Sequence, residues 1–191
     1  MPDNYFEDKV FEGVDFSARP FETGEYESCR FHHCIFPADS MAGAEFTDCL
    51  FEDCHLSNTG MSKTTFNGAR FVNCKIQGVF FDDCNEFLFE AIFEGCQISY
   101  SSFTGRSLKK QHFKNCKLVE VDFSGADLTE AVFENSALPG TKFENTTLIK
   151  TDFRTAVDFS IDPSRNKFKK ARFSQSGLAG LLEKYELDIQ P

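Results

Sequence analysis

The sequence predicts an all-β solenoid, a rod made of stacked coils of short strands. Three observations predict it: large apolar residues recur at every fifth position, small residues often lie two positions before them, and Gly, Asn or Asp often lie two positions after them. A period of five fits neither the spacing of three and four in a helix nor the alternation of a strand. It is the period of a short extended piece and a corner, which can bury its apolar residue only when copies stack above and below it.

The large apolar positions form two unbroken series at steps of five residues. The first runs from Phe6 to Phe81, and the second runs from Leu88 to Phe153, where Phe alternates with Leu or Ile. Only 41% of the chain is hydrophobic, so it is not a chance result that all thirty positions of the two series hold large apolar residues. These positions are therefore the predicted core.

The two series are separated by a longer step. It spans residues 82–87 and predicts a register shift, since a corner or bulge is needed to accommodate the two extra residues. Phe80, Phe87 and Phe89 lie outside the inward positions nearby. We expect them to pack over the bulge, and the alternative is an exposed apolar contact patch.

The repeated unit resembles that of the pentapeptide repeat family. The units that carry the resemblance include ARFVN at 69–73, ADLTE at 126–130 and AVFEN at 131–135. The resemblance implies a right-handed quadrilateral β-helix with four sides of five residues in each coil, so residues twenty apart stack about 4.8 Å from each other. We therefore expect residues 1–155 to form the β-helix and residues 156–191 to form a separate C-terminal segment.

The C-terminal segment changes pattern. Four apolar residues have the spacing of one helix face, Ser176 is a candidate N-cap, and the last two apolar residues alternate as in a strand. We expect a short α-helix that caps the open end of the β-helix, and the resemblance to the quinolone-resistance members of the family implies a homodimer through this segment. The cap and dimer interface is expected to consist of Leu178, Leu181, Leu182, Tyr185, Leu187 and Ile189.

The stretch ESCRFHHCIF at residues 27–36 raises the question of a metal or redox site. All eight cysteines of the chain lie in the small position before a large apolar residue, where a thiol serves as a small core side chain. His32 and His33 fall at outward and corner positions and cannot converge on Cys29 and Cys34, whereas a structural zinc site needs four ligands around one point. We expect no metal, no cofactor and no disulfide, because side chains that stack in parallel suit that bond poorly.

Several function classes are excluded by composition. The formal net charge of −10 makes direct binding of nucleic acid unexpected, and neither a secretory signal nor a membrane span is visible. A cytoplasmic location follows as an expectation. We also expect no enzymatic activity, because the four histidines (His32, His33, His55 and His112) lie on different stacks and no nucleophile motif is present.

Acidic residues are concentrated in the N-terminal half. Residues 1–86 hold 16 acids and 6 bases, whereas residues 87–191 hold 14 of each. Stacking at twenty residues places Glu7 beneath Glu27 and Glu25 beneath Glu45, and like charges in register cost stability. Such a surface either keeps the chain in solution or binds a basic partner. The candidate partner-binding residues are Glu7, Asp8, Glu12, Glu25, Glu27, Glu45, Asp48 and Glu52.

The resemblance implies a function for this surface. Members of the quinolone-resistance type are acidic rods that mimic duplex DNA and bind the type II topoisomerases DNA gyrase and topoisomerase IV. The expected function is therefore a non-enzymatic DNA mimic that modulates DNA gyrase or protects it from quinolones. The alternative is a general protein-interaction scaffold with another partner, since this chain has none of the long inserted loops that one subgroup uses against gyrase.

Overall fold

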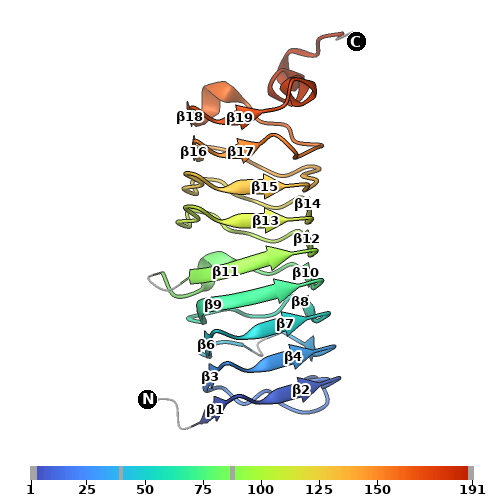
Figure 1. Cartoon of the computed structure of the whole chain (residues 1–191), viewed down its shortest axis with the longest axis vertical. Coiled ribbons are helices and arrows are strands. Elements are labelled where there is room, and N and C mark those ends of the chain that lie inside the picture. The colour runs from blue at the N-terminus through green and yellow to red at the C-terminus, as the bar shows by residue number, and fades with distance from the viewer. Residues whose placement is uncertain (1–3, 39–40, 87–88, 189–191) are drawn as a thin grey trace.

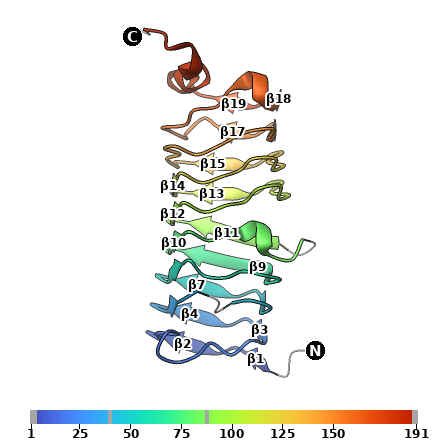
Figure 2. The same cartoon turned by 180° about the vertical axis from the view of Figure 1, so that it is seen from behind.

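The computed structural model describes residues 4–38, 41–86 and 89–188. The chain forms a parallel β-solenoid of about eight coils, with the N-terminus and the C-terminus at opposite ends of a rod (Figures 1 and 2). The front strands run from left to right as the chain rises, so the coil is right-handed (Figure 1). The predicted right-handed β-helix is confirmed.

Each coil has four sides, which we number by the inward residue of the first coil. Face 1 contains Phe6, face 2 Phe11, face 3 Phe16 and face 4 Phe21. Face 1 includes β1 (Tyr5–Glu7), β3 (Glu25–Glu27), β6 (Glu45–Thr47), the first half of β9 (Thr65–Val72), β16 (Thr147–Ile149) and β18 (Lys167–Lys169). Face 2 includes β2 (Val10–Glu12), β4 (Arg30–His32), β7 (Leu50–Glu52), the second half of β9, most of β11 (Phe89–Glu94), β13 (His112–Lys114), β15 (Val132–Glu134), β17 (Asp152–Phe153) and β19 (Arg172–Phe173). Face 3 includes β5 (Ile35–Phe36), β8 (His55–Ser57), β10 (Lys75–Gln77), β12 (Gln97–Ser99) and β14 (Lys117–Val119), and face 4 is built mainly of turns.

Aromatic rings stack along the inside of the rod. Parallel pairing places Phe11 beside Phe31 and Phe31 beside Phe51, each twenty residues further along the chain. The ring centroids of these pairs are 4.7 and 4.8 Å apart and the rings are nearly parallel. Offset stacking of this kind adds about 0.5–1.5 kcal/mol per pair beyond the burial of the rings.

The small inward position holds the cysteines. All eight are buried, which confirms the prediction that they serve as small core side chains. Each column is tied to the coil below: the Cys74 thiol donates to the Phe51 carbonyl at 3.3 Å, and Thr64 donates to the Met41 carbonyl at 2.8 Å from the equivalent position. One column of cysteines continues across the register shift, because backbone hydrogen bonds link its successive coils. This column consists of Cys34, Cys54, Cys74, Cys96 and Cys116.

Corner positions adopt left-handed backbone geometry. Asp8, Asp48 and Asn73 have φ of 51°, 52° and 53°, a region that is costly for most L-residues and cheapest for Gly, Asn and Asp. The amide of each corner residue donates to the coil above, as Asp48 does to the Asn67 carbonyl at 2.8 Å. This geometry explains the residue types found two positions after each large residue.

The register shift lies between faces 4 and 1. It contains the 3₁₀ turn η1 (Phe81–Asp83), and the pairing of β9 with β11 is irregular between Phe89 and Ala91. Phe89 packs partly buried against the core, as expected, whereas Phe80 is 54% exposed and does not pack over the bulge. Phe87 lies outside the described residues.

Arg106 holds this shift in place. Its side chain is buried in an inward position normally occupied by a small residue. The guanidinium donates to the carbonyls of Cys84 at 3.0 Å and Asn85 at 2.8 Å and lies 4.8 Å from the centre of the Phe89 ring. The sequence pattern did not reveal this contact, because a buried arginine is foreign to the repeat.

The C-terminal segment differs from the prediction in two ways. Parallel pairing continues beyond residue 155 through β18 and β19, where Phe173 stacks on Phe153 with centroids 5.2 Å apart. The segment after it forms two 3₁₀ turns, η3 (Ser176–Leu181) and η4 (Glu183–Tyr185), and a further 3₁₀ turn, η2 (Pro163–Arg165), lies between β17 and β18.

No α-helix forms among the described residues of this end. Gly177 and Gly180 interrupt the segment, and glycine costs a helix about 1 kcal/mol relative to alanine. Gly180 also lies against Phe159 so closely that a Cβ atom would collide with the Phe159 carbonyl oxygen. The predicted N-cap is wrong as well, since η3 begins after Gln175 and the Ser176 hydroxyl lies 3.2 Å from the Ser174 hydroxyl.

The apolar residues of the segment are only partly used. Leu181 packs against the core, while Leu178, Leu182, Tyr185 and Leu187 are exposed. Leu187 is not in a strand, contrary to the prediction, and Ile189 lies outside the described residues. No helix in the described part of the chain is long and apolar enough to cross a membrane.

Candidate partner-binding surface

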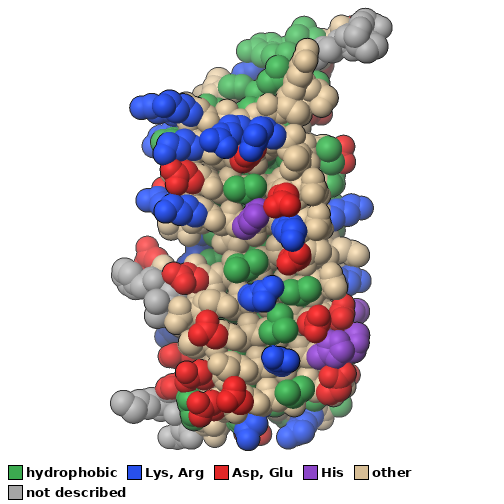
Figure 3. All heavy atoms as spheres, in the orientation of Figure 1, with side chains coloured by type: hydrophobic (Ala, Val, Ile, Leu, Met, Phe, Trp, Pro, Cys, Tyr) green, Lys and Arg blue, Asp and Glu red, His purple; other side chains and the backbone are tan. Residues whose placement is uncertain are grey.

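The eight predicted acidic residues lie on two adjoining faces at the N-terminal end of the rod. We call this set the acidic patch. Red side chains lie over β1 and β3 in Figure 3. On face 1 the patch consists of Glu7, Glu25, Glu27 and Glu45, on face 2 of Glu12 and Glu52, and at the corner between them of Asp8 and Asp48.

The four glutamates of face 1 form a stack without bases. Glu7 pairs with Glu27 across β1 and β3, and Glu25 pairs with Glu45 across β3 and β6. The sequences of these strands are YFE, EYE and EFT, so none of the three carries a lysine or arginine. Because directly opposed like charges destabilise a sheet, this arrangement raises the free energy of the folded rod.

The strands fix where these carboxylates point. Successive side chains of a strand point to opposite faces, so the inward central residue sends both of its neighbours outward. Tyr26 and Phe46 are the central residues of β3 and β6, and both are buried in the core. The carboxylates therefore project from a rigid surface, which lowers the entropy that a partner must overcome on binding.

One neutral group lies within the stack. The Tyr5 hydroxyl donates to Glu27 at 2.6 Å, and this hydrogen bond raises the pKa of Tyr5 to about 12. The negative charges of Glu7 and Glu25 act in the same direction. Glu27 thus has a hydrogen-bond partner that leaves its charge uncompensated.

Face 2 has a mixed charge. Arg30 and Arg70 lie with Asp8 and Asp48 along a corner groove of about 440 Å³. The ladder at the other edge places His32 between Glu12 and Glu52. The hydrogen bond to Glu12 and the nearby carboxylates raise the pKa of His32. The sequence grouped all eight acids together, but only the four glutamates on β1, β3 and β6 of face 1 lie on strands without bases.

Charge changes sign along face 1. The upper coils carry Lys150 beside β16 and Lys167, Lys169 and Lys170 in and after β18, and blue side chains gather there in Figure 3. Some acids in this half are paired, as in Glu94 with Lys114 at 2.8 Å. The sequence predicts the balanced charge of this half and shows a basic stretch that includes KFKKAR at 167–172, but it did not predict that these bases lie on face 1.

Family models match most of the repeat region. The model described as "Pentapeptide repeat region" matches residues 21–103. The model described as "Pentapeptide repeats (8 copies)" matches residues 91–129, 108–145 and 116–154. The two models meet within the coil that contains the register shift, so the match continues on both sides of it.

Solved structures with the same fold include two of trypsin-treated QnrB1, which is described as a plasmid-mediated fluoroquinolone resistance protein. The first is 21% identical, with a TM-score of 0.57, and the alignment covers 98% of this chain and 90% of that chain. The second is 18% identical, with a TM-score of 0.52, and the alignment covers 98% and 100%. At these identities the likeness shows a common β-helical fold. Comparison with curated proteins gives no match.

Proposed function

Because the chain belongs to the pentapeptide repeat family, we propose that it is a non-enzymatic rod that binds a type II topoisomerase through face 1 of the acidic patch. The partner we infer is DNA gyrase, and the rod takes the place of a DNA segment in a basic groove. Binding modulates the enzyme or protects it from quinolones. The fold shared with QnrB1 and that protein's description as a fluoroquinolone resistance protein support this choice of partner.

A single observation carries the proposal. Glu7 with Glu27 and Glu25 with Glu45 form opposed carboxylate pairs with no base on their strands. Opposed like charges cost the free rod stability, and a basic partner removes that cost when it binds. A rigid row of negative charges is also what a surface built to bind DNA phosphates recognises.

The thiols support a role without catalysis. A reactive cysteine needs an exposed thiolate with a lowered pKa. All eight thiols are instead buried. Burial raises the pKa of both Cys49 and Cys84 to about 12, whereas hydrogen bonds with neighbouring buried thiols lower the pKa of Cys54 and Cys96. The Cys49 thiol donates to the Tyr26 carbonyl at 3.3 Å, which is a structural use of the group.

The proposal is tested by a supercoiling assay with purified gyrase, with and without a fluoroquinolone. The triple variant Glu25→Lys, Glu27→Lys and Glu45→Lys should lose the effect of the wild-type rod on supercoiling and on drug inhibition. The matched control reverses three exposed acids of the other half, Glu120, Glu183 and Glu186, and should retain it. An effect that is equal in both variants, or that does not weaken as salt rises, contradicts the proposal.

A general scaffold with another partner is the second candidate, and the C-terminal end favours it. Leu178, Leu182, Tyr185 and Leu187 leave an apolar surface exposed beyond the last coil. We propose that a second copy of the chain covers this surface, which gives a homodimer. Sedimentation equilibrium of the wild type and of a Leu182→Asp, Tyr185→Asp variant tests this: a dimer that becomes a monomer supports it, and equal masses contradict it.

A further inference from the structure

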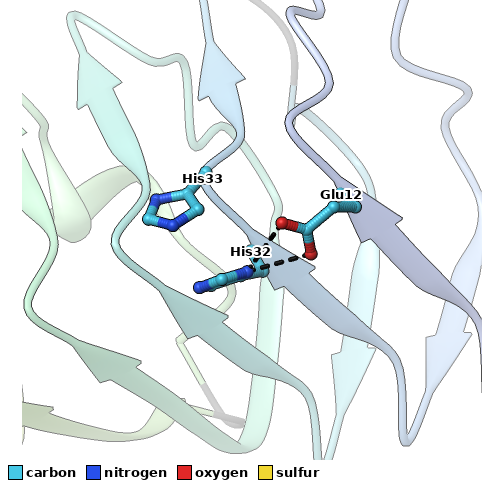
Figure 4. Close-up of side chains that lie close together, drawn as sticks. All are labelled: Glu12, His32 and His33. Atoms are coloured by element: carbon cyan, nitrogen blue, oxygen red, sulfur yellow. Dashed lines mark hydrogen bonds and ion pairs between the residues drawn. The ribbon is translucent and has the colours of Figure 1, made fainter.

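Three side chains from neighbouring coils converge on the surface of face 2, as Figure 4 shows. They are Glu12 of β2, His32 of β4 and His33 at the corner that follows β4. One ligand atom from each lies within 4.8 Å of the other two. His32 Nδ1 is 2.9 Å from both oxygens of Glu12, and the two imidazole centroids are 3.9 Å apart.

The backbone holds all three residues in place. Glu12 and His32 are register partners in parallel strands. The Gly13 amide donates to the His32 carbonyl at 2.8 Å, and the His33 amide donates to the Glu52 carbonyl at 3.0 Å. The arrangement therefore does not depend on a mobile loop, and side-chain rotation alone can bring the three donors to one point.

A second carboxylate comes from the coil above. Asp53 Oδ2 lies 3.6 Å from His32 Nε2, on the opposite side of the ring from Glu12. His32 is therefore oriented by acids on both sides. Carboxylates that hydrogen-bond to an imidazole fix its ring and raise its basicity as a ligand, as is usual around metal-binding histidines.

The chemistry of the donor set selects one class of ion. Two imidazole nitrogens and a carboxylate oxygen suit first-row divalent transition metals such as Zn²⁺, Ni²⁺ and Cu²⁺. Ca²⁺ and Mg²⁺ prefer sites made of oxygen atoms alone. An ordinary ion pair needs only one histidine, as in His112 with Glu134 at 3.0 Å, and that pair serves as an internal comparison.

We propose that Glu12, His32 and His33 bind a divalent transition-metal ion, with water completing its coordination and Asp53 beside the His32 nitrogen that faces away from the ion. The ion links the first coil to the second, because Glu12 and the histidines belong to successive coils. It also adds two positive charges to the half of the chain that carries the excess of acid. The expected result is a rod whose N-terminal coils are harder to unfold when the ion is bound.

Sequence reasoning excluded a metal site here for a reason that holds only for the thiols. Cys29 and Cys34 are buried and hydrogen-bond to the carbonyls of Phe6 and Phe11, away from both histidines. The third ligand instead lies twenty residues earlier, at Glu12. Only the stacking of coils brings it to His32 and His33.

The experiment titrates the full-length chain with ZnCl₂ in a calorimeter and loads it with one equivalent of Cu²⁺ for electron paramagnetic resonance. The wild type should bind one Zn²⁺ per chain, and its Cu²⁺ spectrum should show hyperfine coupling to two imidazole nitrogens. His33→Asn is the informative variant, since Asn73 occupies the same corner column with φ of 53° and the fold should be kept. It should bind Zn²⁺ at least about tenfold more weakly, because the loss of a residue that only supports a metal ligand already weakens binding by about that factor. Its Cu²⁺ spectrum should show coupling to one imidazole nitrogen.

The matched control is His112→Asn, which removes an exposed histidine that pairs with a glutamate and has no second imidazole beside it among the described residues. Its Zn²⁺ affinity and Cu²⁺ spectrum should equal those of the wild type. Circular dichroism confirms that both variants are folded. Absence of Zn²⁺ binding in the wild type, equal weakening in both variants, or a single coupled nitrogen in the wild type would overturn the site.

Discussion

Glu25 lies directly beneath Glu45, paired in register across β3 and β6, and neither strand contains a base. Replacing Glu25 by Lys should stabilise the rod by about 0.2–1 kcal/mol, because an opposed pair of like charges becomes a pair of opposite charges. Urea unfolding at low salt measures the change. The control is Glu94→Lys, which breaks the pair with Lys114 and should destabilise by a similar amount. A loss of stability in Glu25→Lys would show that the stack is not repulsive.

The phenylalanine column should supply much of the stability. Phe51 is fully buried and stacks on Phe31 and Phe71 with centroids 4.8 and 4.7 Å away. Phe51→Ala should cost about 3–5 kcal/mol in the free energy of unfolding. Phe80→Ala, at an exposed site, should change it by less than about 0.5 kcal/mol. Similar values for the two variants would contradict the inward column.

Arg106 should matter far more than a surface arginine. Arg106→Leu removes two hydrogen bonds, to the carbonyls of Cys84 and Asn85, and the loss of the buried bond to Cys84 should alone cost about 1–3 kcal/mol. Arg154→Leu removes an exposed pair with Asp152 and should cost about 0–1 kcal/mol. Thermal unfolding of both variants measures these costs. An equally small effect in Arg106→Leu would show that Arg106 does not stabilise the register shift.

The Tyr5 hydroxyl should titrate late. Its pKa is raised to about 12 by the hydrogen bond to Glu27, from an ordinary value near 10. The stabilising contribution of this hydrogen bond is therefore present below pH 10 and is lost as pH rises through about 12. Ultraviolet difference titration of the wild type against Tyr5→Phe isolates this group. In Glu27→Gln the transition should move toward 10, and an unmoved transition would mean that Glu27 is not its cause.

The sequence predicted the features that depend only on the period. Phe51 and Cys54 are inward because each repeats the environment of the residue twenty positions before it, and the register shift follows from counting. The same reasoning failed at Arg106. Its long side chain reaches the coil below and donates to the carbonyl of Cys84, which lies in the register shift and has no counterpart in a regular repeat. It also failed at Gly180, where a helical apolar spacing was overruled by contact with Phe159.

The candidate surface was predicted only in part. Counting by twenty placed Glu25 beneath Glu45, and the structure agrees. The approach of His32 and His33 depends on side-chain directions at a corner, so it could not be read from spacing. The mixed charge of face 2 arises from Arg30 and Arg70. These arginines stack in a different column from the acids, so the stacking of the acids alone did not predict that the two charges lie side by side.

DNA mimicry is tested by a competition between the rod and duplex DNA for gyrase. A fluorescent duplex bound to gyrase is titrated with the wild-type rod, and its anisotropy is followed at low and at raised salt. The wild-type rod should displace the duplex, less effectively as salt rises, and the variant reversed at Glu25, Glu27 and Glu45 should not displace it. A rod that binds gyrase while the duplex stays bound, or a reversed variant that displaces the duplex equally well, would show that the rod does not act as a DNA mimic.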